Sequence, residues 1–263
     1  MVVRILCVKD MVVYTAKRAI EILQEEGFLE LSNRSRDFIK HQLGIGRCQF
    51  KYNTIKNEIV NKLHYDSPPN PDSPIFLNPN HIEYGIYGFS TVQNGLGKVK
   101  SGNWDHKSNC KLVANDDTIK GIRQRFEEDK NWKETVYYKQ LKSKYGGDEE
   151  RIKNRCEFVD TLYQNIKNNG YRPARTNNNI RQRSGYGQHL EVLVIIDRNG
   201  NIYHQGKGSH RLGISKILNI EIPVQVLVRH KSWQKIRDDI YNNGLSDKYS
   251  KLQDHPDIQD ISH

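Results

Sequence analysis

Residues 191 to 204 constrain the fold more than any other stretch of the sequence. They begin with an apolar, β-branched run, EVLVIID, which is typical of a strand. Asn199-Gly200 follows it, and a second apolar run begins at Ile202. An Asn-Gly pair between two strand-like runs is the strongest short-range signal for a β-hairpin. We therefore expect two antiparallel strands here.

Helices and a further strand are expected on both sides of this hairpin. The spacing of apolar residues predicts helices over 148–169, 209–218 and 232–241 and a strand over 222–228. Residues 118–145 also have helical spacing, whereas residues 81–111 are rich in glycine and aromatic residues, which favours loops and short strands. The predicted fold class is α+β, with a mixed sheet and helices in the C-terminal part, preceded by a mainly helical N-terminal region.

The pattern divides the chain into five parts. Five of the eight prolines lie between residues 65 and 80, and this clustering predicts a linker or a long loop. The parts are a helical N-terminal region (1–64), the Pro-rich linker (65–80), a loop-rich and helical middle region (81–150), a sheet-containing domain (151–243) and a flexible tail (244–263).

Charged residues near the N-terminus exclude some classes of protein. Arg4, Lys9 and Lys17 interrupt the apolar runs, so we expect neither a signal peptide nor a transmembrane segment, and we predict a cytoplasmic location. The four cysteines lie far apart without a C-x-x-C pair, which argues against a structural zinc site and a disulfide scaffold. Reduced thiols and no protein-bound metal site are expected.

Positive charge is concentrated in one part of the chain. The formal net charge is +10, and residues 151 to 230 carry 13 Lys and Arg against 5 Asp and Glu. Such a local field favours phosphate, a nucleotide or nucleic acid as the partner, with a solvated basic face as the alternative.

The segment GKGSHR, residues 206–211, lies between the hairpin and the following helix. Its glycines permit backbone conformations that are closed to other residues, and Ser209 is a favourable N-cap. Backbone amides at a helix start, together with His210 and Arg211, would form a cradle for phosphate. A tight connection without a ligand is the alternative, and the spacing is not that of a Walker A loop.

The run VLVIIDRNGNIYHQGKGSHRLGISKILNIEIPVQVLV resembles the core of the ParB/sulfiredoxin superfamily, which has a hairpin, a G-x-H-R turn, a helix and a strand that begins near Ile-Pro-Val. The preceding FVDTLYQNIKNNGYRP resembles the helix before that core, so the similarity covers about residues 155–230. The stretches GNWD, NWKET and VRHKSW are further similar to a group of archaeal proteins that carry this domain.

The resemblance implies a nucleotide whose phosphates rest on the G-x-H-R turn. Members of the superfamily include sulfiredoxins, CTP-dependent DNA switches, a free serine kinase and nucleases. A nucleoside triphosphate with Mg²⁺ is therefore expected, with ATP preferred and CTP as the second choice. The resemblance assigns phosphate contacts to Gly208, Ser209, His210, Arg211, Thr161 and Asn165.

Departures from the superfamily pattern reduce the number of activities that we expect. The sulfiredoxin nucleophile is a cysteine whose position here is Ser209, so we do not expect sulfiredoxin activity. Kinase-like members carry an acid before the glycine, where this chain has Lys207, a cation that would add to phosphate affinity. The residues after His230 are too few for the helix-turn-helix domain of a ParB-type switch.

Phosphoryl transfer also needs a group that orients the acceptor. Asp105, in a loop rich in glycine and aromatic residues, is the preferred carboxylate, and Glu191 and His210 are further catalytic candidates. Trp104 and His230 are candidates for substrate contacts. Each has a structural alternative: Asp105 would cap a turn, and Trp104 would fill the core.

An arginine-rich arm precedes the first strand of the hairpin and is a candidate for contacts with an acidic substrate or nucleic acid: Arg172, Arg175, Arg181 and Arg183. A loop without a ligand is the alternative. We predict a phosphotransferase or hydrolase that uses a nucleoside triphosphate and an unidentified acceptor. The alternatives are a DNA-binding protein or nuclease of ParB-like type, and a nucleotide-gated module without turnover.

Overall fold

The computed structural model describes residues 45–173 and 190–261 of the chain. Contacts divide the chain into two compact units, residues 1–49 and 50–263. Of the first unit, only the opening turns of α3 (Ile45–His64) are described. None of the helices in the described ranges has both the length and the apolar character needed to cross a bilayer. The fold given below is that of the second unit.

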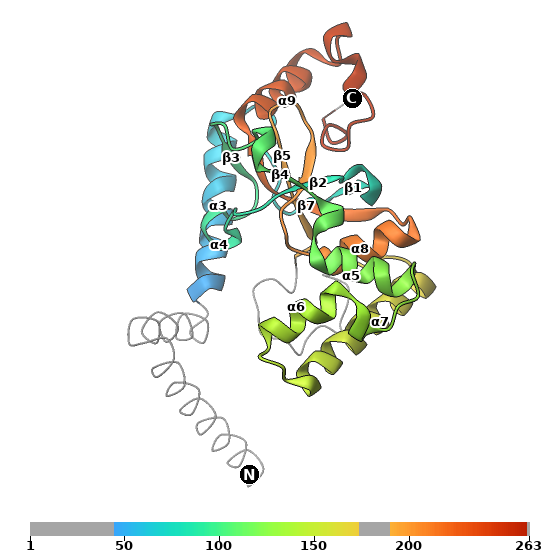
Figure 1. The fold of residues 1–263 in the computed structure, drawn as a ribbon. Helices are drawn as coiled ribbons and strands as arrows, with labels where there is room; N and C mark the ends of the chain where they lie inside the picture. The colour runs from blue at the N-terminus through green and yellow to red at the C-terminus, as the bar shows by residue number, and fades with distance from the viewer. Residues whose placement is uncertain (1–44, 174–189, 262–263) are drawn as a thin grey trace. The chain divides into compact units, whose positions relative to one another are not determined.

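The centre of this unit is a seven-stranded mixed sheet (Figure 1). Its strands are β1 (Ile75–Leu77), β2 (Tyr84–Ile86), β3 (Lys98–Lys100), β4 (Cys110–Leu112), β5 (Val192–Ile196), β6 (Ile202–His204) and β7 (Ile222–His230). They follow the order β1-β7-β5-β6-β2-β4, and β3 also pairs with β7. Strands β5 and β6 are antiparallel, whereas β5 and β7 are parallel. The predicted α+β class is confirmed.

The predicted hairpin is formed by β5 and β6. Asp197 begins its turn, and the Asp197 carboxylate accepts hydrogen bonds from the backbone N–H groups of Asn199 and Asn201 at 2.8 Å each. Gly200 has a φ of 91°. A Cβ atom at Gly200 would lie 2.5 Å from the ring of Trp233, so both the backbone conformation and the space require glycine.

Helices cover the two ends of the sheet. They are α4 (Thr91–Asn94), α5 (Asp117–Phe126), α6 (Val136–Lys144), α7 (Glu149–Asn169), α8 (Ser209–Leu218) and α9 (Lys231–Asn243). Short 3₁₀ turns occur at η1 (Pro79–His81), η2 (Lys107–Asn109), η3 (Val113–Asn115), η4 (Trp132–Glu134) and η6 (Asp247–Leu252). Helices α5, α6 and α7 gather around α8, whereas α9 packs on β7 and β3 (Figure 1).

The continuous helix predicted over 118–145 is wrong, because the chain forms α5 and α6 with a break over residues 127–135. Asp129 has a φ of 52°, which a helix does not accommodate. The hydroxyl of Thr135 then accepts a hydrogen bond from the N–H of Tyr138 at 3.1 Å and begins α6.

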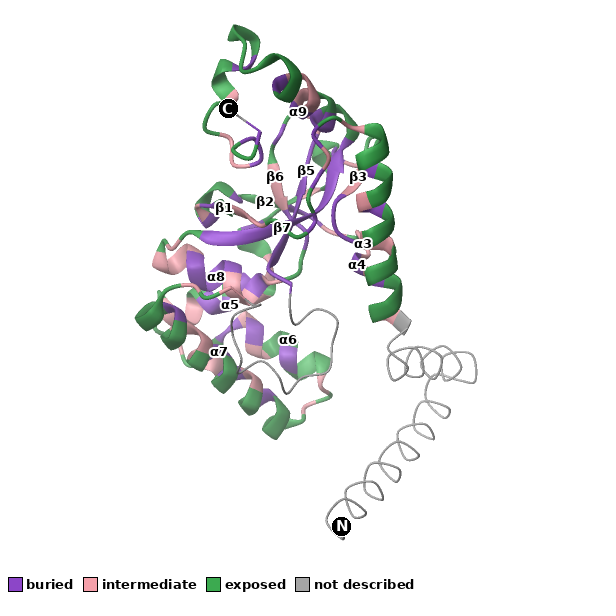
Figure 2. Cartoon of the chain, turned by 180° about the vertical axis from the view of Figure 1, so that it is seen from behind, coloured by how far each residue is buried: buried purple, intermediate pink, exposed green. Residues whose placement is uncertain are grey.

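Both faces of the sheet are buried. Side chains from β5 alternate between two cores: Val192, Val194 and Ile196 pack with α8 and α9, while Leu193 and Ile195 pack with β2 and α3. A third core joins α5, α6 and α7 to α8. Figure 2 shows β7 buried along its length. Strand β5 is buried at every position, and burial on both faces explains its uninterrupted apolar run in the sequence.

The Pro-rich segment is part of the sheet and not a linker. Strand β1 lies within it and pairs with β7, with Ile75 opposite Val224. The N–H of Ser67 donates to Asp238 at 3.0 Å, and the Ser67 carbonyl accepts from Gln234 at 2.6 Å. Edge strands tolerate neighbouring prolines. The sheet therefore draws on residues 75–112 as well as on the predicted domain at 151–243.

The prediction of a flexible tail is wrong for residues 244–261. Asp257 is 1% exposed and pairs with the buried Arg229 and Arg237. Ile258 enters the same core as α9. A buried guanidinium needs an anionic partner, and the tail supplies it.

Candidate functional site

The turn between β6 and α8 lies against the start of β5. The N–H of Leu193 donates to the carbonyl of Lys207 at 3.1 Å. Gly206 and Gly208 have φ values of 110° and 88°, in the region that favours glycine. A Cβ atom at Gly208 would lie 2.9 Å from the Cα of Val192. The two glycines therefore allow the backbone to pass close to β5 before α8 begins.

The first turn of α8 directs backbone amides away from the helix. Ser209, His210 and Arg211 are its first three residues, and amides in a first turn have no acceptor within their own helix. Gly208 is the N-cap and supplies no side-chain acceptor. The helix dipole makes this end positive, so the backbone favours an anion here.

Arg211 and Glu191 form an ion pair beside this turn. The Arg211 guanidinium lies 2.9 Å from the Glu191 carboxylate, and the two side chains are 21% and 6% exposed. Tyr171 donates to Glu191 at 2.8 Å and accepts from Arg211 at 3.0 Å. Arg211 also donates to the carbonyl of Leu190. Glu191 therefore holds Arg211 in place and is not an open carboxylate for an acceptor.

His210 is packed against Tyr137 and Arg155. Its Nε2 lies 2.7 Å from the hydroxyl of Tyr137, which accepts a hydrogen bond from Arg155 at 3.2 Å. Burial, followed by the charge of Arg155, lowers the pKa of His210 to about 3. The imidazole is therefore neutral near pH 7, and its Nε2 is engaged by Tyr137; His210 as a donor to phosphate and as a catalytic residue stays a prediction.

Two arginines lie at the same turn: Arg211 belongs to it, and a guanidinium nitrogen of Arg155 lies 3.4 Å from both ring nitrogens of His210. Arg155, Lys144 and Arg211 all lower the pKa of His210 by their charge. Among the residues that the structure describes, Arg211 has a carboxylate partner, whereas neither Arg155 nor Lys144 lies within ion-pair distance of one. Positive charge is thus held next to the positive end of a helix, where cations are unfavourable without an anion.

Ser209 is engaged within the turn. Its hydroxyl lies 3.1 Å from Nε2 of His204 and donates to the carbonyl of Gly206 at 3.2 Å. His204 is fully buried, and burial lowers its pKa to about 4. The Ser209 side chain therefore shapes the turn, and the His204 contact was not anticipated from the sequence.

On α7, the residue that reaches the α8 turn is Arg155. The two predicted positions, Thr161 and Asn165, are exposed, and the Thr161 hydroxyl donates to a carbonyl of its own helix at 2.9 Å. Arg155 lies four residues before Val159, which is fully buried, so helical spacing places both on the inward face. That spacing was the signal that could have identified Arg155.

Asp105 lies at the other end of β5. Two oxygens of its carboxylate bind the Arg198 guanidinium at 2.6 and 2.7 Å, and Arg198 follows β5 whereas Glu191 precedes it. The hydrogen bonds from Arg198 lower the pKa of Asp105 to about 2. A strand of five residues spans roughly 15 Å. Asp105 therefore fastens a loop to the hairpin and does not face the α8 turn.

His230 and Trp104 lie at the same end as Asp105. His230 is the N-cap of α9, and its Nδ1 accepts from the N–H of Ser232 at 3.0 Å. Its Nε2 lies 2.9 Å from the carbonyl of Gly102. The Trp104 and His230 ring centroids are 5.5 Å apart. These contacts give His230 a structural role at the start of α9.

Among the remaining predicted residues, Lys207 and Arg172 are exposed. Arg175, Arg181 and Arg183 lie outside the described residues. Comparisons with protein-family models, with curated proteins and with solved structures found no match. The assignment to the ParB/sulfiredoxin superfamily therefore stays a prediction.

Proposed function

We propose that this protein binds a nucleoside triphosphate, with the phosphates at the start of α8. The observation that carries the proposal is the charge at the turn, where Arg155 and Arg211 accompany the amides of the first helical turn. A polyphosphate would satisfy both the amides and the cations. The resemblance to a nucleotide-binding superfamily favours ATP, with CTP as the second choice.

The proposal concerns binding and not turnover. Glu191 is the carboxylate next to the turn in the described ranges, and Tyr171 and Arg211 both engage it. The described residues contain no group of three or more His, Cys, Asp or Glu side chains that could hold a metal ion. Mg²⁺ would accompany the nucleotide, bound chiefly through its phosphates.

Thermal unfolding with a panel of nucleotides tests the proposal. A nucleotide at 100 times its dissociation constant stabilises the folded state by about 2.7 kcal/mol, which corresponds to a rise of several degrees in the melting temperature. We expect this rise with ATP or CTP in the presence of Mg²⁺. A panel of ATP, CTP, GTP and ADP without any effect would refute the proposal.

Two arginine variants of α7 locate the site. Arg155→Gln removes a cation at the α8 turn, and we expect it to reduce the nucleotide-induced rise relative to the melting temperature of the unliganded variant. Arg151→Gln is the matched control, because Arg151 is exposed one turn earlier and stacks on Tyr145 at 4.6 Å. An equal rise in both variants would place the phosphates elsewhere.

A further inference from the structure

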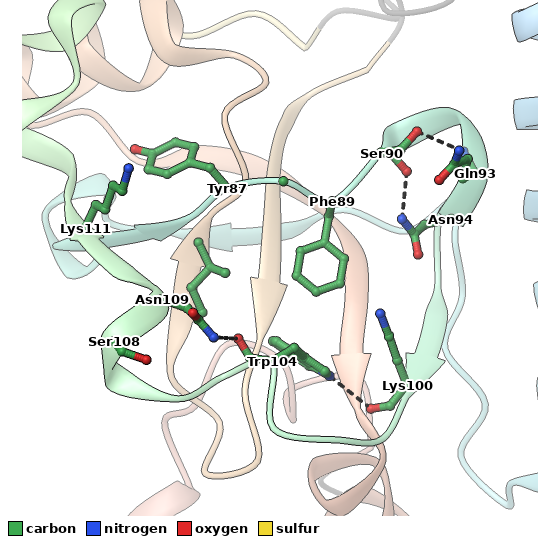
Figure 3. A pocket seen from close by; sticks show the side chains of 12 residues that line it. Tyr87, Phe89, Ser90, Gln93, Asn94, Lys100, Trp104, Ser108, Asn109 and Lys111 are labelled. Atoms are coloured by element: carbon green, nitrogen blue, oxygen red, sulfur yellow. Dashed lines mark hydrogen bonds between the residues drawn. The ribbon is translucent and has the colours of Figure 1, made fainter.

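A hollow lies on the sheet face opposite α8. It has a volume of about 560 Å³ and lies between the loop after β2, strand β3 and the loop before β4 (Figure 3). Pockets of this size hold small organic ligands. None of residues 206–211 lines it, although Tyr87, which does, has its ring 3.2 Å from where a Cβ atom of Gly206 would be. The hollow is therefore distinct from the α8 turn.

The charged side chains around this hollow are both cationic. Lys100 and Lys111 lie on opposite sides of it, with Phe89 and Trp104 between them (Figure 3). No Asp or Glu lines it. Within the described ranges, neither lysine forms an ion pair with a carboxylate. Two cations facing one hollow without an anion favour an anionic ligand.

Aromatic rings form the floor of the hollow. Phe89 and Trp104 make an edge-to-face pair with ring centroids 5.3 Å apart. The Nζ atom of Lys100 lies 5.1 Å from the Phe89 ring centroid. Both rings are half-buried, so each retains an accessible part. Fixed rings next to cations are the arrangement on which bases of single-stranded nucleic acids stack.

Amide oxygens complete the lining. The side-chain NH₂ of Asn94 donates to the Ser90 carbonyl at 2.7 Å, and that of Asn109 donates to the Trp104 carbonyl at 3.1 Å. These bonds orient the two amides and use one N–H of each, and the amide oxygens are acceptors. Exocyclic amino groups of a base are matching donors, whereas a plain aromatic carboxylate has none.

We propose that this hollow binds one nucleotide unit, with the base against Phe89 and Trp104 and the phosphate on one of the flanking lysines, Lys100 or Lys111. The ligand is a planar base that carries a phosphate, either as a free nucleotide or as part of a single strand. This site is separate from the one at α8, so either proposal stands without the other.

The three tryptophans allow the two sites to be observed separately. In a ¹H–¹⁵N correlation spectrum, each indole N–H gives one signal. Trp104 reports on the hollow, and Trp132 reports on the α8 turn because its ring lies 5.7 Å from Tyr137, the partner of His210. Trp233 is fully buried and hydrogen-bonded to Asp257, and it serves as the internal control.

The experiment titrates the full-length protein with AMP. We expect the Trp104 signal to move and the Trp233 signal to stay. Adenosine and ribose 5-phosphate, which lack the phosphate and the base respectively, should each bind at least about tenfold more weakly. The absence of any Trp104 response to AMP, or an equal response to ribose 5-phosphate, would overturn the proposal.

Lysine variants test whether Lys100 and Lys111 bind the phosphate. We expect Lys100→Gln with Lys111→Gln to weaken AMP binding at least about tenfold, measured by the Trp104 signal. Lys139→Gln with Lys142→Gln on α6 is the matched control, because both lysines are exposed. Arg155→Gln should leave the Trp104 response unchanged. Loss of the response in Arg155→Gln, with retention in the Lys100/Lys111 variant, would place AMP at α8 and overturn the proposal.

A short single strand, (dA)₈, distinguishes the source of the nucleotide unit. If nucleic acid is the natural ligand, (dA)₈ binds more tightly than AMP and its affinity falls steeply with salt concentration. If a free nucleotide is the ligand, AMP binds at least as tightly as (dA)₈. A Trp132 response to ATP without any Trp104 response to AMP would support the site at α8 alone.

Discussion

Replacing Glu191 by glutamine separates a structural from a catalytic role for this carboxylate. Breaking a buried ion pair by removal of one partner costs about 3–5 kcal/mol. Here the Arg211 side chain is 21% exposed and keeps its bonds to Tyr171 and Leu190, and glutamine keeps one oxygen acceptor. We therefore expect Glu191→Gln to lower the free energy of unfolding by about 2 kcal/mol.

The assay is urea unfolding followed by circular dichroism, with an unchanged slope in urea. The same loss corresponds to a fall of roughly 4–8 °C in melting temperature for a domain of this size. Glu157→Gln is the matched control, because Glu157 pairs with Lys153 at the surface with side chains 60% and 75% exposed, and such pairs contribute under about 1 kcal/mol. A loss for Glu191→Gln no larger than the control would refute the reasoning.

Nucleotide binding should respond to Glu191→Gln in the opposite direction to stability. Removing the Glu191 charge makes the α8 turn more positive, so the nucleotide-induced rise in melting temperature should be retained or increased in Glu191→Gln. A variant that is destabilised and also unresponsive to nucleotide would argue that Glu191 organises the binding geometry itself.

Three further predictions concern the turn, its histidine and the tail. Gly208→Ala should lower the free energy of unfolding by about 1–3 kcal/mol, because φ at Gly208 is 88° and a new Cβ atom would lie 2.9 Å from Val192. Gly213→Ala in α8 should be neutral or stabilising, because its Cβ atom would make only ordinary contacts at 3.5 Å; equal losses for the two variants in urea unfolding would contradict the geometry. The pKa of His210 is about 3 in the folded protein, against 6.5 for an unperturbed histidine, so between these pH values only the unfolded chain binds the proton and stability falls as the pH drops. In His210→Gln, the slope of unfolding free energy against pH in this window should be flatter by about 1.4 kcal/mol per pH unit, and an unchanged slope would show that His210 does not titrate in this way. Asp257→Asn should destabilise by about 3–5 kcal/mol in urea unfolding, since it removes the anion that pairs with the buried Arg229, whereas Arg237 keeps Asp260. A loss below about 1 kcal/mol would contradict a buried ionic tail.

Local signals in the sequence predicted much of the fold. Helix α8 begins and ends at the predicted residues, and α7 differs from its predicted range by one residue at its start. The β5–β6 hairpin forms around Asn199-Gly200 as predicted. These features depend on turn residues, caps and apolar spacing within a few positions along the chain, so they can be read without knowledge of the fold.

The predicted site was only partly assembled by the fold. Glu191 and Arg211 do come together with the Gly208 turn, but as partners of each other. Asp105 was predicted to orient the acceptor and instead binds Arg198, which follows β5, whereas the Gly208 turn lies against the start of that strand. Arg155 was missed, although its spacing from Val159 places it on the inward face of α7, and only the tertiary structure shows that it contacts Tyr137 and His210.

The sequence by itself determined the hairpin, the glycine turn and the helix that follows it, because each is specified by residues that are adjacent in the chain. Only the tertiary structure decided the ionisation and the partners of the turn. His210 is neutral because Tyr137, 73 residues away, and Arg155, 55 residues away, are packed against it. Burial and charge depend on such distant contacts, and no local pattern records them.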